Sequence, residues 1–570
     1  MGATVPAKTK AGEPAAVVDN AELPNARTIN ENAGDTSESE TGTPETQEEE
    51  SDYLQLILNS HVYDIASETP LTHAVHLSGR IGNQVFLKRE DLQGVFSFKI
   101  RGAYNRISQL TAAERERGII ACSAGNHAQG VAQSAQHLGI PATIVMPRLT
   151  PAIKWRNVQR LGAKVVLFGA GFDEAKAECA RLQQLHGLTD IPPFDDPLVI
   201  AGQGTVALEG TVALEVLRQR KAADIDAVFV AVGGGGLIAG MGAFIKRVRP
   251  DIRVIGVETH DACALKQSLA AGKRVALSDV GLFADGTAVR RVGRETFRVA
   301  QQVVDEVVVV SNDEVCAAIK DAFEDTRSVL EPSGALALAG LKKHVRTKGL
   351  QNQNLVAVAS GANMDFDRLR FVAERAAVGE RREVLLTADI PERPGAFSLL
   401  HAAIHPRAIT EFTYRYGRPD RAVVFVSFKV ADRENEVREV IQALKAHGDM
   451  DARDQSDNEL AKSHARYIVG GRSAVPNEYL LRFEFPERHG ALKKFLAGLR
   501  FDWNITLFQY RYFGHDVARV LVGVQVPPTE DDPLPSPGAV PASLQRFLDD
   551  LDYRYVNETE NPVYQQFMRY

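Results

Sequence analysis

The chain has 570 residues, which is more than one hydrophobic core supports, so we expect two to four domains. Its 44% hydrophobic and 24% charged residues are typical of a soluble protein, and the net charge of −7 gives no sign of nucleic-acid binding. Its four cysteines form no CxxC pair, which argues against disulfides and a cysteine-bound metal, and we expect no metal site.

The first 52 residues differ in composition from the rest. No Lys or Arg occurs from Thr28 to Gly79, and acidic residues accumulate up to Glu50. Such a segment buries too little apolar surface to offset its ordering entropy, so we expect residues 1–52 to be a disordered acidic extension. It has neither the apolar run of a secretory signal nor the Arg-rich pattern of a typical transit peptide.

Short β-branched apolar runs alternate with helical patterns between residues 53 and 377. The strand candidates lie at 85–87, 118–121, 142–146, 164–168, 227–230, 254–257 and 355–358. Helical patterns between them include 128–138 and 173–186. This alternation predicts an α/β domain of mostly parallel sheets with helices on both faces, and ligands at the carboxyl ends of the strands.

A run of four glycines, Gly233–Gly236, follows one strand candidate and precedes a helical pattern that begins at Leu237. Backbone without Cβ atoms can turn several N–H groups toward one point beside a helix N-terminus, which favours phosphate. The loop matches neither the dinucleotide fingerprint nor the nucleotide P-loop. The alternatives are a turn without a ligand and an uncharged membrane span, and the glycines argue against the span.

Three further segments at strand ends carry polar or reactive side chains. Lys99 lies between two apolar residues, Ser123–Gly130 follows a strand and opens a helix, and Ser360–Asn363 follows the last strand. Taken singly, they are compatible with a surface lysine, an Asn-capped helix start and a plain turn. Taken together with a phosphate loop, they indicate pyridoxal phosphate, which offers an aldehyde to a lysine and a phosphate to the glycines.

The region after residue 381 contains an internal repeat. Residues 385–396 parallel 480–491, and residues 409–416 parallel 505–512, with a one-residue change of offset between the two blocks. Each copy has the pattern of a small α+β module. Neither copy carries an evident catalytic set, so binding or regulation is the expected role.

Five segments closely resemble the biosynthetic threonine dehydratases (threonine deaminases), which belong to the tryptophan-synthase-β-like pyridoxal enzymes of fold type II. They are Lys88–Tyr104, Ser123–Gly130, Val232–Leu237, Glu331–Ala335 and Ser360–Asn363, in the order typical of that family. The resemblance implies five parts after the extension: a catalytic domain at 53–377, ACT-like regulatory modules at 381–455 and 476–557, a polar linker at 456–475 and a tail at 558–570.

The family implies dehydration and deamination of L-threonine to 2-oxobutanoate and ammonia, the first committed step of isoleucine biosynthesis. It also implies pyridoxal 5′-phosphate as cofactor, feedback by isoleucine with valine as a second candidate effector, and a homotetramer. We expect no nucleic-acid or membrane partner. Eukaryotic relatives imply a mitochondrial location, with the cytoplasm as the alternative because the N-terminus has the wrong composition for a presequence.

The resemblance also implies roles for single residues. Lys99 would bind the cofactor aldehyde covalently and later remove the Cα proton, with Ser123 as the second catalytic residue. The residues implied to hold the cofactor are Lys99, Phe98, Asn126, Gly233, Gly234, Gly235, Gly236, Leu237 and Ser360. Those implied to hold the substrate are Ser123, Ala124, Gly125, Asn126 and His127. Effectors are expected near Gly395, Phe397, Tyr414, Gly490 and Tyr510.

Within these roles, Phe98 would pack on the cofactor ring, Asn126 would hold its 3-oxygen, and Ser360 would face its nitrogen. A serine hydroxyl cannot stabilise a protonated ring nitrogen as an aspartate would, which favours loss of a β-substituent over transamination. Glu331 is expected near the cofactor without an assigned role. Either the cofactor phosphate or a water would protonate the leaving hydroxyl.

Two groups of alternatives stay open. A catabolic serine/threonine dehydratase, a serine racemase or a threonine synthase shares the same chemistry, and the tandem repeat argues against the first two. A catalytically inactive amino-acid sensor would keep both folds, and the intact Lys99, glycine loop and Ser360 argue against it.

Overall fold

The computed structural model describes residues 52–569, except 212–224, 392–395, 414–419, 468–471, 473, 487–493, 496–497, 501–502, 512–516, 531, 534 and 537–538. Within the part described, no helix combines the length and hydrophobicity that a membrane crossing requires.

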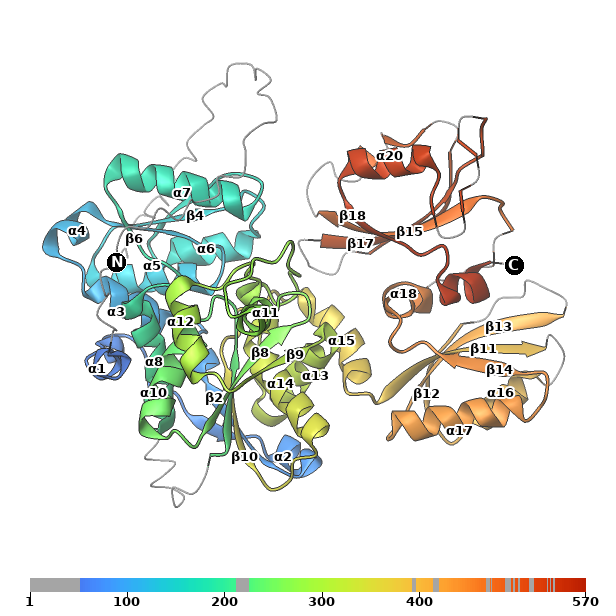
Figure 1. Cartoon of the computed structure of the whole chain (residues 1–570), viewed down its shortest axis with the longest axis horizontal. Coiled ribbons are helices and arrows are strands. Elements are labelled where there is room, and N and C mark those ends of the chain that lie inside the picture. The colour runs from blue at the N-terminus through green and yellow to red at the C-terminus, as the bar shows by residue number, and fades with distance from the viewer. Residues whose placement is uncertain are drawn as a thin grey trace, which may run out of the picture. The chain divides into compact units, whose positions relative to one another are not determined.

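A six-stranded sheet forms the centre of the larger catalytic subdomain (Figure 1). Its order is β1 (Leu71–His73), β2 (Gln84–Arg89), β10 (Asn354–Ala359), β7 (Ala227–Ala231), β8 (Arg253–Thr259) and β9 (Glu306–Val310). All neighbouring pairs are parallel except β1 with β2. The alternation of strands and helices in the sequence predicts this parallel sheet.

Helices cover both faces of this sheet, which explains why its strands are apolar on both sides. On β10, Leu355 and Ala357 pack with α13 (Asn312–Thr326) and α14 (Pro332–Lys348). Val356 and Val358 pack on the other face with α10 (Gly236–Val248) and α12 (Arg294–Val303).

A second, fully parallel sheet has the order β5 (Lys164–Leu167), β4 (Ala142–Met146), β3 (Ile119–Cys122) and β6 (Thr189–Asp190). Its core is shared with α5 (Asn126–Leu138) and α6 (Ala152–Arg160) on one face and with α7 (Phe172–His186) on the other. Helix α5 also packs against α3 (Lys99–Ser108), where a Cβ on Gly130 would lie 3.1 Å from the carbonyl of Lys99. This close approach brings the start of α3 to the small sheet.

The C-terminal half contains two antiparallel sheets with one design. The first sheet has the order β12 (Ile409–Thr413), β13 (Arg421–Lys429), β11 (Glu383–Pro391) and β14 (Asp451–Asp454). The second sheet has the order β16 (Asn504–Arg511), β17 (Val517–Gln525), β15 (Glu478–Pro486) and β18 (Arg554–Asn557). Helices α16 (Ala396–Ile404) and α17 (Arg433–Lys445) pack against the first sheet. Helix α20 (Ala542–Leu551) packs against the second sheet. Both sheets have a register shift directly after an isoleucine, Ile409 or Ile505. The sequence repeat predicts this shared topology.

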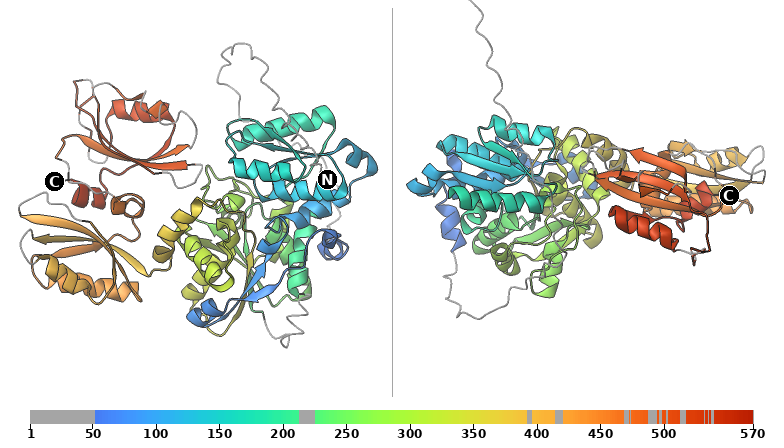
Figure 2. Two further views of the ribbon diagram at one scale, coloured as in Figure 1. Left: turned by 180° about the vertical axis from the view of Figure 1, so that it is seen from behind. Right: turned by 90° about the horizontal axis from the view of Figure 1, so that it is seen from above.

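The stretch expected to be a polar linker contains a buried helix, α18 (Glu459–Ser463). Leu460 and Ala461 are buried in one cluster with strand residues of both sheets, and Tyr564 and Phe567 of the expected C-terminal tail join it. Figures 1 and 2 show α18 and the C-terminal helical turn between the two modules. Both segments therefore help to hold the modules together, because their few apolar residues point into a shared core.

A cluster of ionic side chains connects α13, α15 (Arg368–Gly379), α18 and β17. The Arg375 guanidinium donates to Asp313 Oδ1 at 3.0 Å and to Glu459 Oε1 at 2.7 Å. Lys462 pairs with Asp313 at 2.5 Å, and Arg519 pairs with Glu459. The cluster thus joins the catalytic domain to the linker helix α18 and to the second C-terminal module.

Candidate active site

The sequence-predicted site residues follow strands at their carboxyl ends. Ser123 comes directly after β3, Gly233 lies just beyond β7, and Ser360 directly after β10. Lys99 is the first residue of α3, and the backbone N–H of the preceding Phe98 donates to the carbonyl of Ser360 at 3.2 Å. The structure therefore brings Lys99 and Ser360, which are 261 positions apart by their numbers, to one place.

The amine of Lys99 lies in a partly buried position beside apolar groups. It donates a 2.7 Å hydrogen bond to the carbonyl of Pro193, and it lies 5.3 Å from the centre of the Phe98 ring. Burial lowers the pKa of Lys99 to about 8. An amine with this pKa is neutral far more often at physiological pH than a surface lysine, which suits a nucleophile or a base.

The glycine loop is packed so tightly that side chains would not fit. A Cβ on Gly234 would lie 2.1 Å from the Phe194 ring, and Gly235 has φ +94°, in the left-handed region that favours glycine. Thr296 Oγ1 donates to the carbonyl of Gly234 at 2.6 Å. Because Phe194 covers this loop and the neighbouring Pro193 accepts from Lys99, one short segment brings the lysine and the glycine loop together.

Leu237, in contrast to the glycines, is a buried core residue of α10. Its side chain packs with the helices on that face of the large sheet. Only its backbone N–H, at the N-terminal end of α10, is suited to an anion.

The turn between β3 and α5 presents backbone N–H groups at a helix N-terminus. Ser123 Oγ accepts from the N–H of Gly125 at 3.3 Å, and Asn126 is the first residue of α5. His127 Nε2 donates to the carbonyl of Ile191 at 2.7 Å. Burial, followed by the charge of Lys99, lowers the pKa of His127 to about 3, so its ring is neutral. The predicted substrate residues Ser123, Ala124, Gly125, Asn126 and His127 are therefore contiguous around one helix end.

The side-chain amide of Asn126 has a partner on each side. Its Nδ2 donates to Glu331 Oε1 at 2.5 Å, and its Oδ1 accepts from Asn363 Nδ2 at 2.7 Å. Glu331 is only 5% exposed. Burial, and next the charge of Asp285, raise the pKa of Glu331 to about 7.

Three charged residues near this site, Asp285, Lys154 and Arg368, belong to none of the sequence motifs. Asp285 pairs with Lys154 at 2.7 Å and with Arg368 at 3.3 Å. Burial alone would raise the pKa of Asp285, but Lys154 and Arg368 lower it to about 2. No sequence pattern marked these residues, because their pairing depends on chain segments that meet only in the fold.

Ser360 is 4% exposed, and its hydroxyl donates to the carbonyl of Ser333 at 3.3 Å. A neutral hydrogen bond of this length is weak, so the hydroxyl can turn to another acceptor at small cost.

The expected effector residues are only partly described. Gly395, Tyr414 and Gly490 lie outside the described residues. Phe397 is the second residue of α16 and Tyr510 belongs to β16. The roles of these five residues stay predictions.

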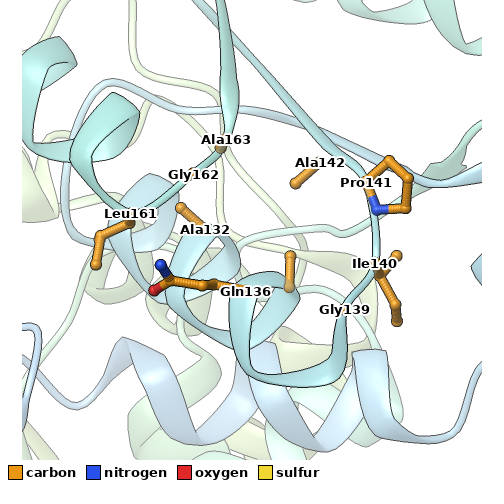
Figure 3. A pocket seen from close by; sticks show the side chains of 10 residues that line it. Ala132, Gln136, Gly139, Ile140, Pro141, Ala142, Leu161, Gly162 and Ala163 are labelled. Atoms are coloured by element: carbon orange, nitrogen blue, oxygen red, sulfur yellow. The ribbon is translucent and has the colours of Figure 1, made fainter.

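A small cavity lies elsewhere in the catalytic domain. It has a volume of about 210 Å³ and is lined by residues such as Gln136, Pro141 and Leu161 (Figure 3). Since an α-helix rises 1.5 Å per residue, Gln136 lies about 15 Å along α5 from Asn126. The cavity is therefore separate from the residues described above. Across the described ranges, no three His, Cys, Asp or Glu side chains are grouped to hold a metal ion.

Two family models match the chain. Residues 62–361 match the pyridoxal-phosphate-dependent enzymes, and residues 374–465 and 469–568 each match the C-terminal regulatory domain of threonine dehydratase. The second model matches twice, once over each copy of the sequence repeat.

Curated proteins and solved structures show the same likeness. The chain is 57% identical over 532 residues to the mitochondrial threonine dehydratase of Saccharomyces cerevisiae, covering 91% of this chain and 89% of the relative. It is 46% identical over 529 residues to the biosynthetic L-threonine dehydratase IlvA of Escherichia coli, covering 93% and 98%. The structure of processed threonine deaminase isoform 2 from Solanum lycopersicum matches with TM-score 0.55 and 51% identity, covering 57% of this chain and 88% of that one.

Proposed function

The chain belongs to the pyridoxal-phosphate-dependent threonine dehydratases with a C-terminal regulatory domain, and we propose that Lys99 is the residue that binds the cofactor covalently. Its reaction is the dehydration and deamination of L-threonine to 2-oxobutanoate and ammonia, which begins isoleucine biosynthesis. One observation supports the assignment of Lys99 most strongly. Its amine donates to the carbonyl of Pro193, and the ring of the next residue, Phe194, covers Gly234 of the glycine loop.

The residues present fit pyridoxal phosphate. An amine whose pKa is lowered to about 8 suits its aldehyde, because a useful fraction of it is neutral at physiological pH. The tightly packed glycine loop at the start of α10 offers N–H groups to its phosphate. When bound, this cofactor withdraws electrons from the amino-acid Cα and so acidifies the Cα proton. Gly233, Gly234, Gly235 and Gly236 with the N–H of Leu237 would hold the phosphate, and Phe98 would pack on the ring.

Lys99 is the base for the Cα proton. A pKa of about 8 leaves a useful neutral fraction at physiological pH, and the amine keeps enough proton affinity to accept the proton. The Pro193 carbonyl orients the amine before it reacts. General-base catalysis of this kind contributes about 10²- to 10⁴-fold to the rate.

The start of α5 would bind the substrate carboxylate. The N–H groups of the Ser123–His127 turn and the Ser123 hydroxyl are suited to an anion. The ring of His127 is neutral, so it neither attracts nor repels the substrate carboxylate through a net charge. Ser360 would donate its hydroxyl to the ring nitrogen without charging it, which favours loss of the β-hydroxyl.

The C-terminal modules regulate the enzyme, and we assign isoleucine as the effector, with valine as a second candidate. The ionic cluster around Arg375 and Glu459 supports a route to the catalytic domain, because it connects α13 with the linker helix α18 and with β17 of the second module. Feedback requires that the effector bind one conformational state more tightly than the other. A homotetramer and a mitochondrial location complete the proposal, the latter supported by the named location of the Saccharomyces cerevisiae relative.

The experiment that tests this function is production of 2-oxobutanoate from threonine, with and without isoleucine, by the full chain and by Lys99→Ala. The full chain should form the oxoacid and lose activity with isoleucine, and Lys99→Ala should form essentially none. Full activity of Lys99→Ala would reject the assigned role of Lys99. Unchanged wild-type activity with isoleucine would reject isoleucine as effector.

A further inference from the structure

The amide of Asn126 is fixed in one orientation by two side chains from distant parts of the chain. Glu331 accepts from Nδ2 at 2.5 Å and Asn363 donates to Oδ1 at 2.7 Å. Asn363 is itself held, since its Nδ2 also donates to the carbonyl of Val95 at 2.8 Å. Because the oxygen of an amide only accepts and its nitrogen only donates, a flipped Asn126 would lose both partners.

Gly361 makes this arrangement sterically feasible. The backbone N–H of Glu331 donates to the carbonyl of Gly361 at 3.2 Å. A Cβ on Gly361 would lie 2.3 Å from Glu331 Oε1 and 3.3 Å from Asn126 Nδ2. The absence of a side chain directly after Ser360 therefore lets the carboxyl reach Asn126.

The amide nitrogen of Asn126 carries two hydrogens, and one of them is donated in the hydrogen bond to Glu331. We propose that Glu331 and Asn363 are positioning residues that act through Asn126, leaving its second N–H for the ring oxygen of the cofactor, and that the charge on Glu331 tunes that contact. The inference rests on the proposed function, in which Asn126 holds the 3-oxygen and Lys99 binds the aldehyde.

Glu331 titrates among several charged groups. Asp285, Lys154 and Arg368 act on it from three other segments, and Asn126 bonds it from α5. The raised pKa of about 7 means that its charge changes near physiological pH. Above this pH the anionic carboxylate of Glu331 accepts a strong hydrogen bond from the Asn126 N–H. Below it the neutral carboxylic acid accepts a weaker hydrogen bond from the same N–H. The bound cofactor should sense this change as a shift of its visible absorbance.

The test compares holoenzymes of wild type, Glu331→Gln, Glu331→Ala and Asn363→Ala, with Glu258→Gln as control. Glu258 is also buried with a pKa raised to about 7, but it accepts from the backbone N–H groups of Leu265 and Lys266 on α11 (Ala264–Ala271). The readouts are the visible absorbance between about pH 5 and pH 9, a range that brackets the shifted carboxyl, and the Kd of apoprotein for added pyridoxal phosphate.

Glu331→Gln keeps an acceptor for Asn126, so its Kd should stay within about threefold of wild type while the absorbance step near neutral pH disappears. Glu331→Ala and Asn363→Ala should raise the Kd by about tenfold, because each removes one hydrogen bond that orients Asn126. Glu258→Gln should keep both wild-type values.

A wild-type absorbance step in Glu331→Gln, or wild-type Kd in Asn363→Ala, would overturn the inference. If Glu331→Ala does not fold, these two variants still decide the question. A wild-type protein without any cofactor band would instead reject the role of Lys99, so the two failures can be told apart.

Discussion

The amine of Lys99 donates a 2.7 Å hydrogen bond to the carbonyl of Pro193, the residue before the phenyl ring that packs on Gly234. One dipeptide therefore contacts both the nucleophile and the loop suited to the cofactor phosphate. Pyridoxal phosphate carries its aldehyde and its phosphate on one ring, so both protein groups must lie within reach of one small molecule. The contacts of Pro193 and Phe194 meet this requirement.

The first prediction concerns the pH dependence of cofactor capture by the apoprotein. Only the neutral amine attacks an aldehyde, and burial lowers the pKa of Lys99 to about 8. The capture rate should rise about tenfold per pH unit below pH 8 and then level off, whereas an exposed lysine would keep rising to about pH 10.4. Stopped-flow absorbance after mixing apoprotein with cofactor measures this rate. A rate that still climbs through pH 10 would contradict the lowered pKa of Lys99.

The second prediction concerns packing at the glycine loop. Gly234→Ala places a methyl group 2.1 Å from the Phe194 ring, so the loop or the ring must move. Overpacking of this kind costs about 1–3 kcal/mol, and the displaced N–H groups should weaken cofactor binding as well. Gly171→Ala is the control, because a Cβ there meets no atom within 4 Å. Equal cofactor affinity in both variants, measured by absorbance titration, would argue against the loop as the phosphate site.

The third prediction concerns the ionic junction. Arg375 is 4% exposed, and Arg375→Ala would leave Asp313 and Glu459 without this cation. Lys462 still pairs with Asp313 and Arg519 with Glu459, so the loss is that of the hydrogen bonds from the Arg375 guanidinium, about 1.5–3 kcal/mol, which urea unfolding would show as a lower midpoint. The control, Arg370→Ala, removes an exposed arginine paired with Glu374 and should cost less than about 1 kcal/mol. Equal midpoints for the two variants would show that the junction adds little to stability.

The fourth prediction concerns Ser360 and the type of reaction. Ser360→Ala removes one donor to the ring nitrogen and should lower kcat by about fivefold, since one hydrogen bond contributes about 1 kcal/mol. Ser360→Asp should also convert part of the bound cofactor to its amine form during turnover, because a carboxylate stabilises a protonated ring. Liquid chromatography of the released cofactor separates the two forms. Cofactor recovered wholly as the aldehyde from Ser360→Asp would contradict the role of Ser360.

Local patterns in the sequence predict seven of the ten strands described in the two catalytic sheets, the glycine loop and the duplicated modules, whereas β1, β6 and β9 match none of the predicted strand runs. Each of these depends on residues that are close in sequence, such as the alternating runs on β10 and the isoleucine before each register shift. The Ser360–Asn363 segment was also visible as a polar strand end. Its contact with Asn126, 237 residues away, was not.

The missing parts depend on long-range packing. Nothing near Pro193 or Phe194 in the sequence indicates that they contact Lys99 and Gly234, because the contact depends on how the two parallel sheets are connected. Leu460 and Ala461 lie in the stretch predicted to be a polar linker for a related reason. Two adjacent apolar residues in a polar stretch give no helical periodicity, yet both are buried between the modules.

The central claim is that Lys99 carries the cofactor, and mass spectrometry of borohydride-treated holoenzyme tests it most directly. Reduction makes the lysine–cofactor bond permanent, so digestion should yield one modified peptide with the added mass on Lys99. Lys99→Ala treated in the same way should carry no stoichiometric label. A label on another lysine of the wild-type protein, with Lys99 unmodified, would contradict the account.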